Sequence, residues 1–141
     1  MILHSKKFER FVNHNKIICS NSIKVHQIRH CDIVDGEEID GVIEEFIEFI
    51  GNRPLVGYYL EFDMAMINKY IKPKLGIKLP NKPIEISALY YDKMIQKYPQ
   101  GNIDLRFDTI MERLYLPMLA KHDAINDVLM SSMIFLKLKN D

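Results

Sequence analysis

The sequence has no long apolar run, few cysteines and no excess of charge of either sign. No stretch approaches the ~18 consecutive apolar residues that a membrane-spanning helix needs, and residues 1–5 do not have the architecture of a signal peptide. Cys19 and Cys31 are its only cysteines, and we expect both to be reduced thiols. Repeats and low-complexity tracts are also absent. These absences predict a cytoplasmic protein without a membrane partner.

The charge is balanced overall but uneven along the chain. At 141 residues the sequence has room for one domain with a sizeable core, and its formal net charge is zero. Residues 1–30 are mainly basic, residues 31–70 are mainly acidic, and the remainder is mildly basic. An acidic middle between basic flanks suits a metal site near a phosphate-binding surface. Taken singly, each acid is better explained as solvated charge on a helix face.

Hydrophobic periodicity predicts an α/β fold. Apolar residues recur at helical spacing in five segments, namely residues 37–50, 61–71, 87–98, 103–114 and 123–138. Asp35 is the predicted N-cap of the first helix. Strands are predicted weakly over residues 5–12, then over 55–60 and 84–86, with irregular chain over 17–28. The alternation of strand and helix favours parallel pairing of the two later strands.

Phe62 and Asp63 directly follow the apolar run of residues 55–60. An acid at the point where a strand gives way to a helix lies at the carboxyl end of the sheet, where ligands usually bind in such folds. Asp63 is therefore a candidate functional carboxylate. The structural explanation, in which Asp63 only caps the following helix, is equally good for this residue alone.

His122 and Asp127 open the last predicted helix. An imidazole on the incoming loop and a carboxylate on the second turn of the helix can point into one cleft. Imidazole can deprotonate a water molecule, and a carboxylate can hold a divalent metal. Taken alone, the segment is better explained with Asp123 as the helix cap and the other two side chains solvated.

Together these motifs resemble the DEDDh exonuclease superfamily, whose members include RNase T and the proofreading epsilon subunit of bacterial DNA polymerase III. Val56 to Asp63 is similar to the family's strand ending in Phe-Asp, and His122 with Asp127 is similar to its His-x-x-x-x-Asp motif. Val25 to Ile28 looks like the family's His-Gly-Ile element, and the Glu-rich helix at residues 37–50 falls where the family has one. The resemblance covers essentially the whole chain.

The resemblance implies an RNase H-like fold, a mixed sheet flanked by helices, and a 3′–5′ exonuclease acting on single-stranded DNA or RNA ends. It implies a two-metal site for Mg²⁺ or Mn²⁺, with Asp63 and Asp127 as ligands and His122 as the general base. Tyr58, Tyr59 and Phe62 are the implied substrate-binding residues. The family has His or Asn where Tyr58 and Tyr59 stand, which changes the pocket beside the metals.

One motif of the family has no counterpart at its expected place. The first catalytic pair, Asp-x-Glu on the first strand, is matched only by Asp35-Gly36-Glu37, which lies in a loop and is read as helix capping. Met1 falls at roughly the third strand of the family, so the first two strands, including the central one, are expected to be absent. We therefore expect residues 1–141 to be a single partial exonuclease domain that is inactive alone. A second copy, another chain or an upstream coding segment would complete it.

Two alternatives remain open on the sequence. The chain is also interpretable as a non-catalytic descendant that binds nucleic acid or a protein through the old cleft, or as an unrelated small α/β scaffold. Cys19, His26, His30 and Cys31 are zinc-ligand types in one stretch, but they lack the paired Cys-x-x-Cys of a structural site. Whether DNA or RNA is preferred cannot be read from the sequence, because both present the same phosphates and stacking bases.

Overall fold

The structure is a computed structural model that describes residues 6–13 and 18–140. The chain divides into two compact units. Unit 1 comprises the described residues of Pro54–Met66 and Asn81–Asp141, and unit 2 those of Leu3–Arg53 and Ile67–Pro80. Each unit is considered by itself. In the described part of the chain, no helix combines the length and apolar character that crossing a membrane requires.

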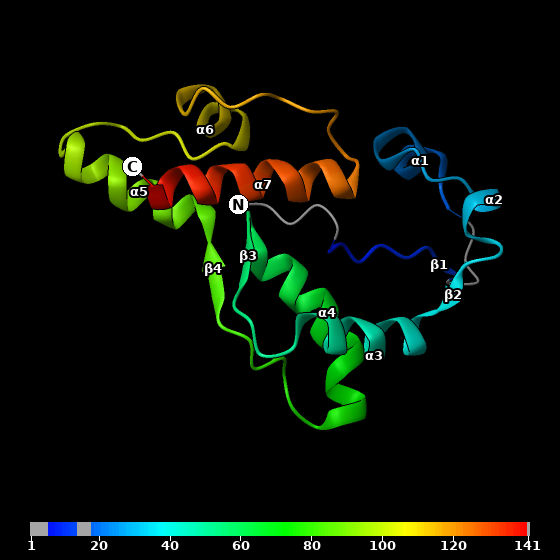
Figure 1. The fold of residues 1–141 in the computed structure, drawn as a ribbon. Helices are drawn as coiled ribbons and strands as arrows, with labels where there is room; N and C mark the ends of the chain where they lie inside the picture. Colours follow the sequence, from blue (N-terminus) through cyan, green and yellow to red (C-terminus); the bar gives the residue numbers. More distant parts are fainter. Residues whose placement is uncertain (1–5, 14–17, 141) are drawn as a thin grey trace. The chain divides into compact units, whose positions relative to one another are not determined.

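Unit 1 is built on two parallel strands, β3 (Leu55–Gly57) and β4 (Pro83–Glu85). Leu55 is paired with Pro83 and Gly57 with Glu85, so the carboxyl ends of the strands lie together (Figure 1). Helix α4 (Leu60–Leu75) follows β3, and α5 (Ile86–Lys97) follows β4. Because parallel neighbours need a crossover, the chain between them leaves unit 1 before it returns at Asn81.

Two further helices complete unit 1, α6 (Phe107–Arg113) and α7 (Ala124–Asn140). Helix α7, orange to red in Figure 1, packs against β3, α5 and α6. The apolar faces of α5, α6 and α7 form one core, whose buried side chains are Ile86, Tyr90, Ile110, Met111, Leu114, Met130, Ile134 and Leu138. The packed helices therefore support the two short strands and the start of α4.

Unit 2 contains the short helices α1 (Ser20–His26) and α2 (His30–Ile33) and the longer α3 (Ile39–Ile50). A two-residue parallel pair joins β1 (Val12–Asn13) to β2 (Glu37–Glu38). Its buried apolar residues are Ile33, Val42, Ile43, Ile50, Ile71 and Leu79. Ion pairs link side chains on its surface. Arg10 pairs with Glu37 and Glu45, and Lys74 pairs with Asp40 and Glu44.

The sequence predicted several of these elements correctly. The two later strands are indeed parallel, and helices lie close to the predicted 37–50 and 123–138. The mixed helix and strand content, with small parallel sheets, is consistent with an α/β exonuclease fold.

Other boundaries were predicted wrongly. Residues 20–26 form α1 where irregular chain was expected, and Pro73 lies inside α4 instead of ending it. Within the described residues of the weak strand at 5–12, only Val12 is in a strand. Helix α3 begins after Glu38, not at Asp35, because Glu37 and Glu38 extend to pair with β1. Residues 5 and 17 lie outside the described residues.

Candidate active site

Asp63 lies in the first turn of α4, six residues beyond the end of β3. Asp63 is exposed, but partial desolvation raises the pKa of its carboxyl group, and the negative charge of Glu85 raises that pKa further. The two carboxylates are therefore close enough to repel each other. Residue 63 occupies the carboxyl end of the parallel strands, as the sequence predicted for it.

Glu85, the last residue of β4, is a residue that the sequence analysis missed. Its Oε2 accepts a hydrogen bond from the Leu60 backbone N–H at 2.8 Å, and its Oε1 accepts one from the Tyr59 N–H at 3.1 Å. Oε1 also accepts bonds from the backbone N–H and the hydroxyl of Ser87. Burial alone would raise the pKa of Glu85, but these hydrogen bonds outweigh burial and the pKa is lowered.

The three aromatic residues around this turn differ in their surroundings. Tyr58 is half-buried against the core of unit 1, its ring 5.0 Å from that of Phe107, and its hydroxyl donates to the Leu105 carbonyl at 3.0 Å. Tyr59 and Phe62 are 69% and 58% exposed, and their rings stack with an interplanar angle of 11°. The exposed pair thus offers a flat apolar surface next to Asp63, whereas Tyr58 already has protein partners.

His122 and Asp127 flank the start of α7. The Asp123 carboxylate accepts a bond from the Asn126 N–H at 2.9 Å, so Asp123 caps the helix as expected from its position. His122 lies before the cap, exposed, with a left-handed φ of 62°, and Asp127 is half-buried in the first turn.

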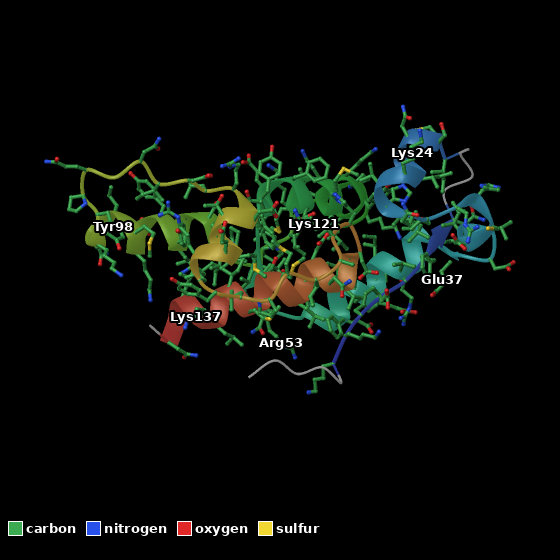
Figure 2. All side chains as sticks on the ribbon, turned by 90° about the horizontal axis from the view of Figure 1, so that it is seen from above. Lys24, Glu37, Arg53, Tyr98, Lys121 and Lys137 are labelled. Atoms are coloured by element: carbon green, nitrogen blue, oxygen red, sulfur yellow. The ribbon has the colours of Figure 1, made fainter. Side chains whose placement is uncertain are left out.

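The loop that carries His122 is held at both sides. The Asn126 side chain donates to the Ala120 carbonyl at 3.1 Å, and Lys121 forms an ion pair with Asp108 of α6. Figure 2 labels Lys121 in this loop and Lys137 in the last turn of α7. Asp63 on α4, His122 in the loop before α7 and Asp127 on α7 all belong to unit 1, and α7 packs directly on β3.

The chemistry of the donors suits a hard divalent cation, but their number does not. Carboxylate oxygens are the ligands that Mg²⁺ prefers, and Asp63 and Asp127 supply them. Among the described residues, however, no three His, Cys, Asp or Glu side chains gather closely enough to hold a metal ion. The described side chains alone therefore do not fit a complete two-metal centre.

Comparisons with known proteins agree with the sequence motifs. The family model described as Exonuclease (RNase_T) matches residues 3–135. The chain is 28% identical to the DNA polymerase III subunit epsilon of Aquifex aeolicus over 134 residues, 95% of this chain and 64% of that protein. It is 27% identical to the PolC-type DNA polymerase III of Bacillus cereus over 135 residues, 96% of this chain and 9% of that protein.

A PolC-type DNA polymerase III of Caldanaerobacter subterraneus is 30% identical over 135 residues, again 9% of its length. The chain thus corresponds to a small segment of the PolC-type relatives and to just under two thirds of the epsilon subunit. The family match covers nearly the whole of this sequence, including β3, α4 and α7. The chain therefore belongs to the exonuclease family, in the DEDDh superfamily of the DNA polymerase III epsilon subunit.

Proposed function

We propose that residues 1–141 form a single partial exonuclease domain that contributes half of a 3′–5′ exonuclease site. In this proposal Asp63 and Asp127 are metal ligands, and His122 is the general base. The observation that carries it is the placement of Asp63 at the carboxyl end of a parallel strand pair, with α7, which bears Asp127, packed on β3. The substrate is a 3′ end of DNA or RNA, the polymer class on which the family acts.

The second pair of carboxylates must come from outside this sequence. The only Asp-x-Glu in the chain, Asp35 to Glu37, lies in unit 2, where Glu37 pairs with β1 and contacts Arg10. Among the described residues, β3 pairs with β4 along one edge alone. A strand that carries Asp-x-Glu, from another chain or a preceding segment, would pair with the other edge.

Asp63, His122 and Asp127 form the proposed half-site, and each has a chemical role that its position supports. Asp63 and Asp127 would hold Mg²⁺ or Mn²⁺ together with the missing carboxylate pair, and the metal would supply charge stabilisation at the scissile phosphate. His122 would accept a proton from water, and its exposure on the loop supports this role. Asp63 and Asp127 contribute the negative charge of the half-site. We include a cytoplasmic location in the proposal, supported by the two free, exposed cysteines.

The test is degradation of 5′-labelled DNA and RNA oligonucleotides in the presence of Mn²⁺, with the chain alone and with a polypeptide that carries the Asp-x-Glu strand pair of the epsilon-subunit relative. We expect no cleavage by the chain alone and stepwise shortening from the 3′ end by the mixture. Asp63→Asn and Asp127→Asn should each lower the rate at least about a thousandfold, because each removes a ligand. Cleavage that survives Asp127→Asn would refute the assignment.

Asp92→Asn is the matched control for these variants. Asp92 is an exposed aspartate on α5 and lies outside the candidate site. The same loss of one negative charge there should leave the cleavage rate unchanged. Mg²⁺-dependent cleavage by the purified chain alone would show instead that the site is complete without a second polypeptide.

A second candidate function is binding of single-stranded nucleic acid without cleavage. The exposed, stacked Tyr59 and Phe62 favour it, because aromatic faces bind bases at about 1–3 kcal/mol per base. In fluorescence anisotropy with a labelled oligonucleotide and EDTA, we expect Phe62→Ala to weaken binding by about tenfold. Tyr98→Ala, at the far end of α5, is the control and should change nothing (Figure 2). Equal affinity of the wild type and Phe62→Ala would exclude a stacking role.

A further inference from the structure

Glu85 connects two helices that are far apart in sequence. It is the N-cap of α5, and its side chain accepts a bond from the Ser87 N–H at 3.2 Å. The same carboxylate accepts the Tyr59 and Leu60 N–H groups at the start of α4, 26 and 25 residues earlier in the chain. The first N–H groups of a helix have no partner within the helix. Glu85 thus supplies an acceptor that the local sequence does not.

The local sequence before α4 is poorly suited to begin a helix. Tyr59 occupies the position before Leu60, where a Ser, Thr, Asp or Asn side chain would normally accept a bond from an N–H group of the first turn. Tyr59 also has a left-handed φ of 56°, a backbone conformation that strains a residue with a Cβ. A conformation of this kind persists only where its surroundings hold it. The two bonds to Glu85 are contacts of this kind, and they fix the backbone N–H groups of Tyr59 and Leu60.

The strand register explains why Glu85 can reach the turn. Gly57, the last residue of β3, is paired with Glu85 of β4. The chain then bends so tightly that a Cβ on Gly57 would lie 2.9 Å from the Leu60 Cδ1 atom. The Tyr59 and Leu60 amides are thereby brought back over the end of the sheet, above the Glu85 side chain. Leu60 itself is 7% exposed, so its side chain is buried where the turn enters α4.

Asp63 lies three residues after Leu60, on the same face of α4. Fixing the Tyr59 and Leu60 amides fixes the axis and the rotation of the first helical turn, and the direction of the Asp63 side chain follows from both. We propose that Glu85 is a positioning residue, whose carboxylate holds the start of α4 and so sets where the Asp63 carboxylate points. The inference rests on the proposed role of Asp63 in the exonuclease site.

The substitution Glu85→Asp separates the effect of the hydrogen bonds to the two amides from the effect of the negative charge. It keeps the negative charge beside Asp63 but shortens the side chain by one carbon–carbon bond, about 1.5 Å. Hydrogen bonds of 2.8 and 3.1 Å would then exceed the ~3.5 Å at which such a bond is lost. Glu61→Gln is the control, because Glu61 is an exposed acid in the same helical turn and makes no contact with the two amides.

The experiment is NMR of the full isotope-labelled chain. In the wild type we expect a through-hydrogen-bond coupling between the Leu60 amide nitrogen and the Glu85 Cδ, and slow hydrogen exchange of the Tyr59 and Leu60 amides. Glu85→Asp should speed exchange of both amides by about tenfold or more and shift the Asp63 Cγ resonance. Glu61→Gln should do neither. The wild-type coupling needs no substitution, so its absence would overturn the proposal even if a variant does not fold.

A second result would also overturn it. If Glu85→Asp frees both amides while the Asp63 Cγ resonance stays in place, Glu85 caps a helix and positions nothing. In the complemented nuclease, Glu85→Asp should lower kcat about tenfold and leave KM within about twofold. If the complemented wild type does not cleave at all, the proposed function fails, whereas the NMR results still decide whether Glu85 positions Asp63.

Discussion

At the scale of single residues, the turn before α6 depends on Asp104. Its carboxylate accepts bonds from the Arg106 N–H at 2.9 Å and the Thr109 hydroxyl at 3.0 Å, and it pairs with the Arg106 guanidinium. The turn presents the Leu105 carbonyl to the Tyr58 hydroxyl beyond the end of β3. Hydrogen bonding and charge from Arg106 hold the pKa of Asp104 well below its ordinary value of 3.8.

This shift predicts a pH dependence of stability. A carboxylate whose pKa is lower in the folded chain stabilises the fold fully above its unfolded-state pKa, and that contribution is lost as the pH falls through the folded-state value. Asp104→Asn should therefore be less stable than the wild type at about pH 6, with a smaller difference at about pH 2.5. Urea unfolding of both chains at each pH measures this. A difference that does not change with pH would contradict the assignment.

At the scale of secondary-structure elements, two glycines allow a matched comparison within unit 2. Gly76, just beyond the end of α4, has a φ of 70°, and its N–H donates to the Lys72 carbonyl at 3.0 Å. Gly41 lies inside α3 without a positive φ. A Cβ added at either position would meet nothing within 4 Å. Any effect of alanine at these two sites therefore reflects backbone conformation and not a clash.

We expect Gly76→Ala to destabilise the chain by about 1 kcal/mol, because alanine resists the left-handed conformation that ends α4. Gly41→Ala should stabilise it by about 0.5–1 kcal/mol, because alanine restricts the unfolded chain and favours helix. The free energy of unfolding from chemical denaturation reports both changes. Equal effects of the two substitutions would contradict the backbone explanation.

Elements with strong periodicity were predictable, and those that depend on distant partners were not. The apolar stripes of α3 and α7 are local, so the sequence located both helices to within a few residues. The two-residue strand β2 exists only because it pairs with Val12 and Asn13, which a pattern search along residues 37–50 does not reveal. Helix α6 starts at Phe107 and not at 103, because the Asp104 side chain turns the chain first.

At the scale of the whole molecule, the carboxylates of the described residues do not amount to a metal centre. We therefore expect Mg²⁺ at millimolar concentration to leave the thermal midpoint of the isolated chain unchanged. With the Asp-x-Glu strands added, Mg²⁺ should stabilise the complex, by about 2.7 kcal/mol at a hundred times its dissociation constant. Differential scanning fluorimetry with EDTA as reference measures this. Saturable stabilisation of the isolated chain would contradict the half-site model.

The sequence singled out candidate site residues where they follow the order of motifs along the chain. Asp63, His122 and Asp127 were proposed from the strand-to-helix transition and the helix start, and their roles stay predictions. Glu85 was not, because its contribution depends on the pairing of β3 with β4 and no local pattern distinguishes it from other acids. The sequence also could not separate Tyr58, which packs against Phe107, from the exposed Tyr59 beside it.

The left-handed backbone at His122 determines which variants give interpretable results there. Alanine at a φ of 62° would add conformational strain to the loss of the imidazole, so a reduced rate would have two causes. Asparagine tolerates this region well, and glycine adopts it freely. His122→Asn therefore tests the proposed proton acceptor without added backbone strain. If His122→Gly is inactive yet regains turnover when imidazole is added to the buffer, the defect is chemical and not a misplaced loop.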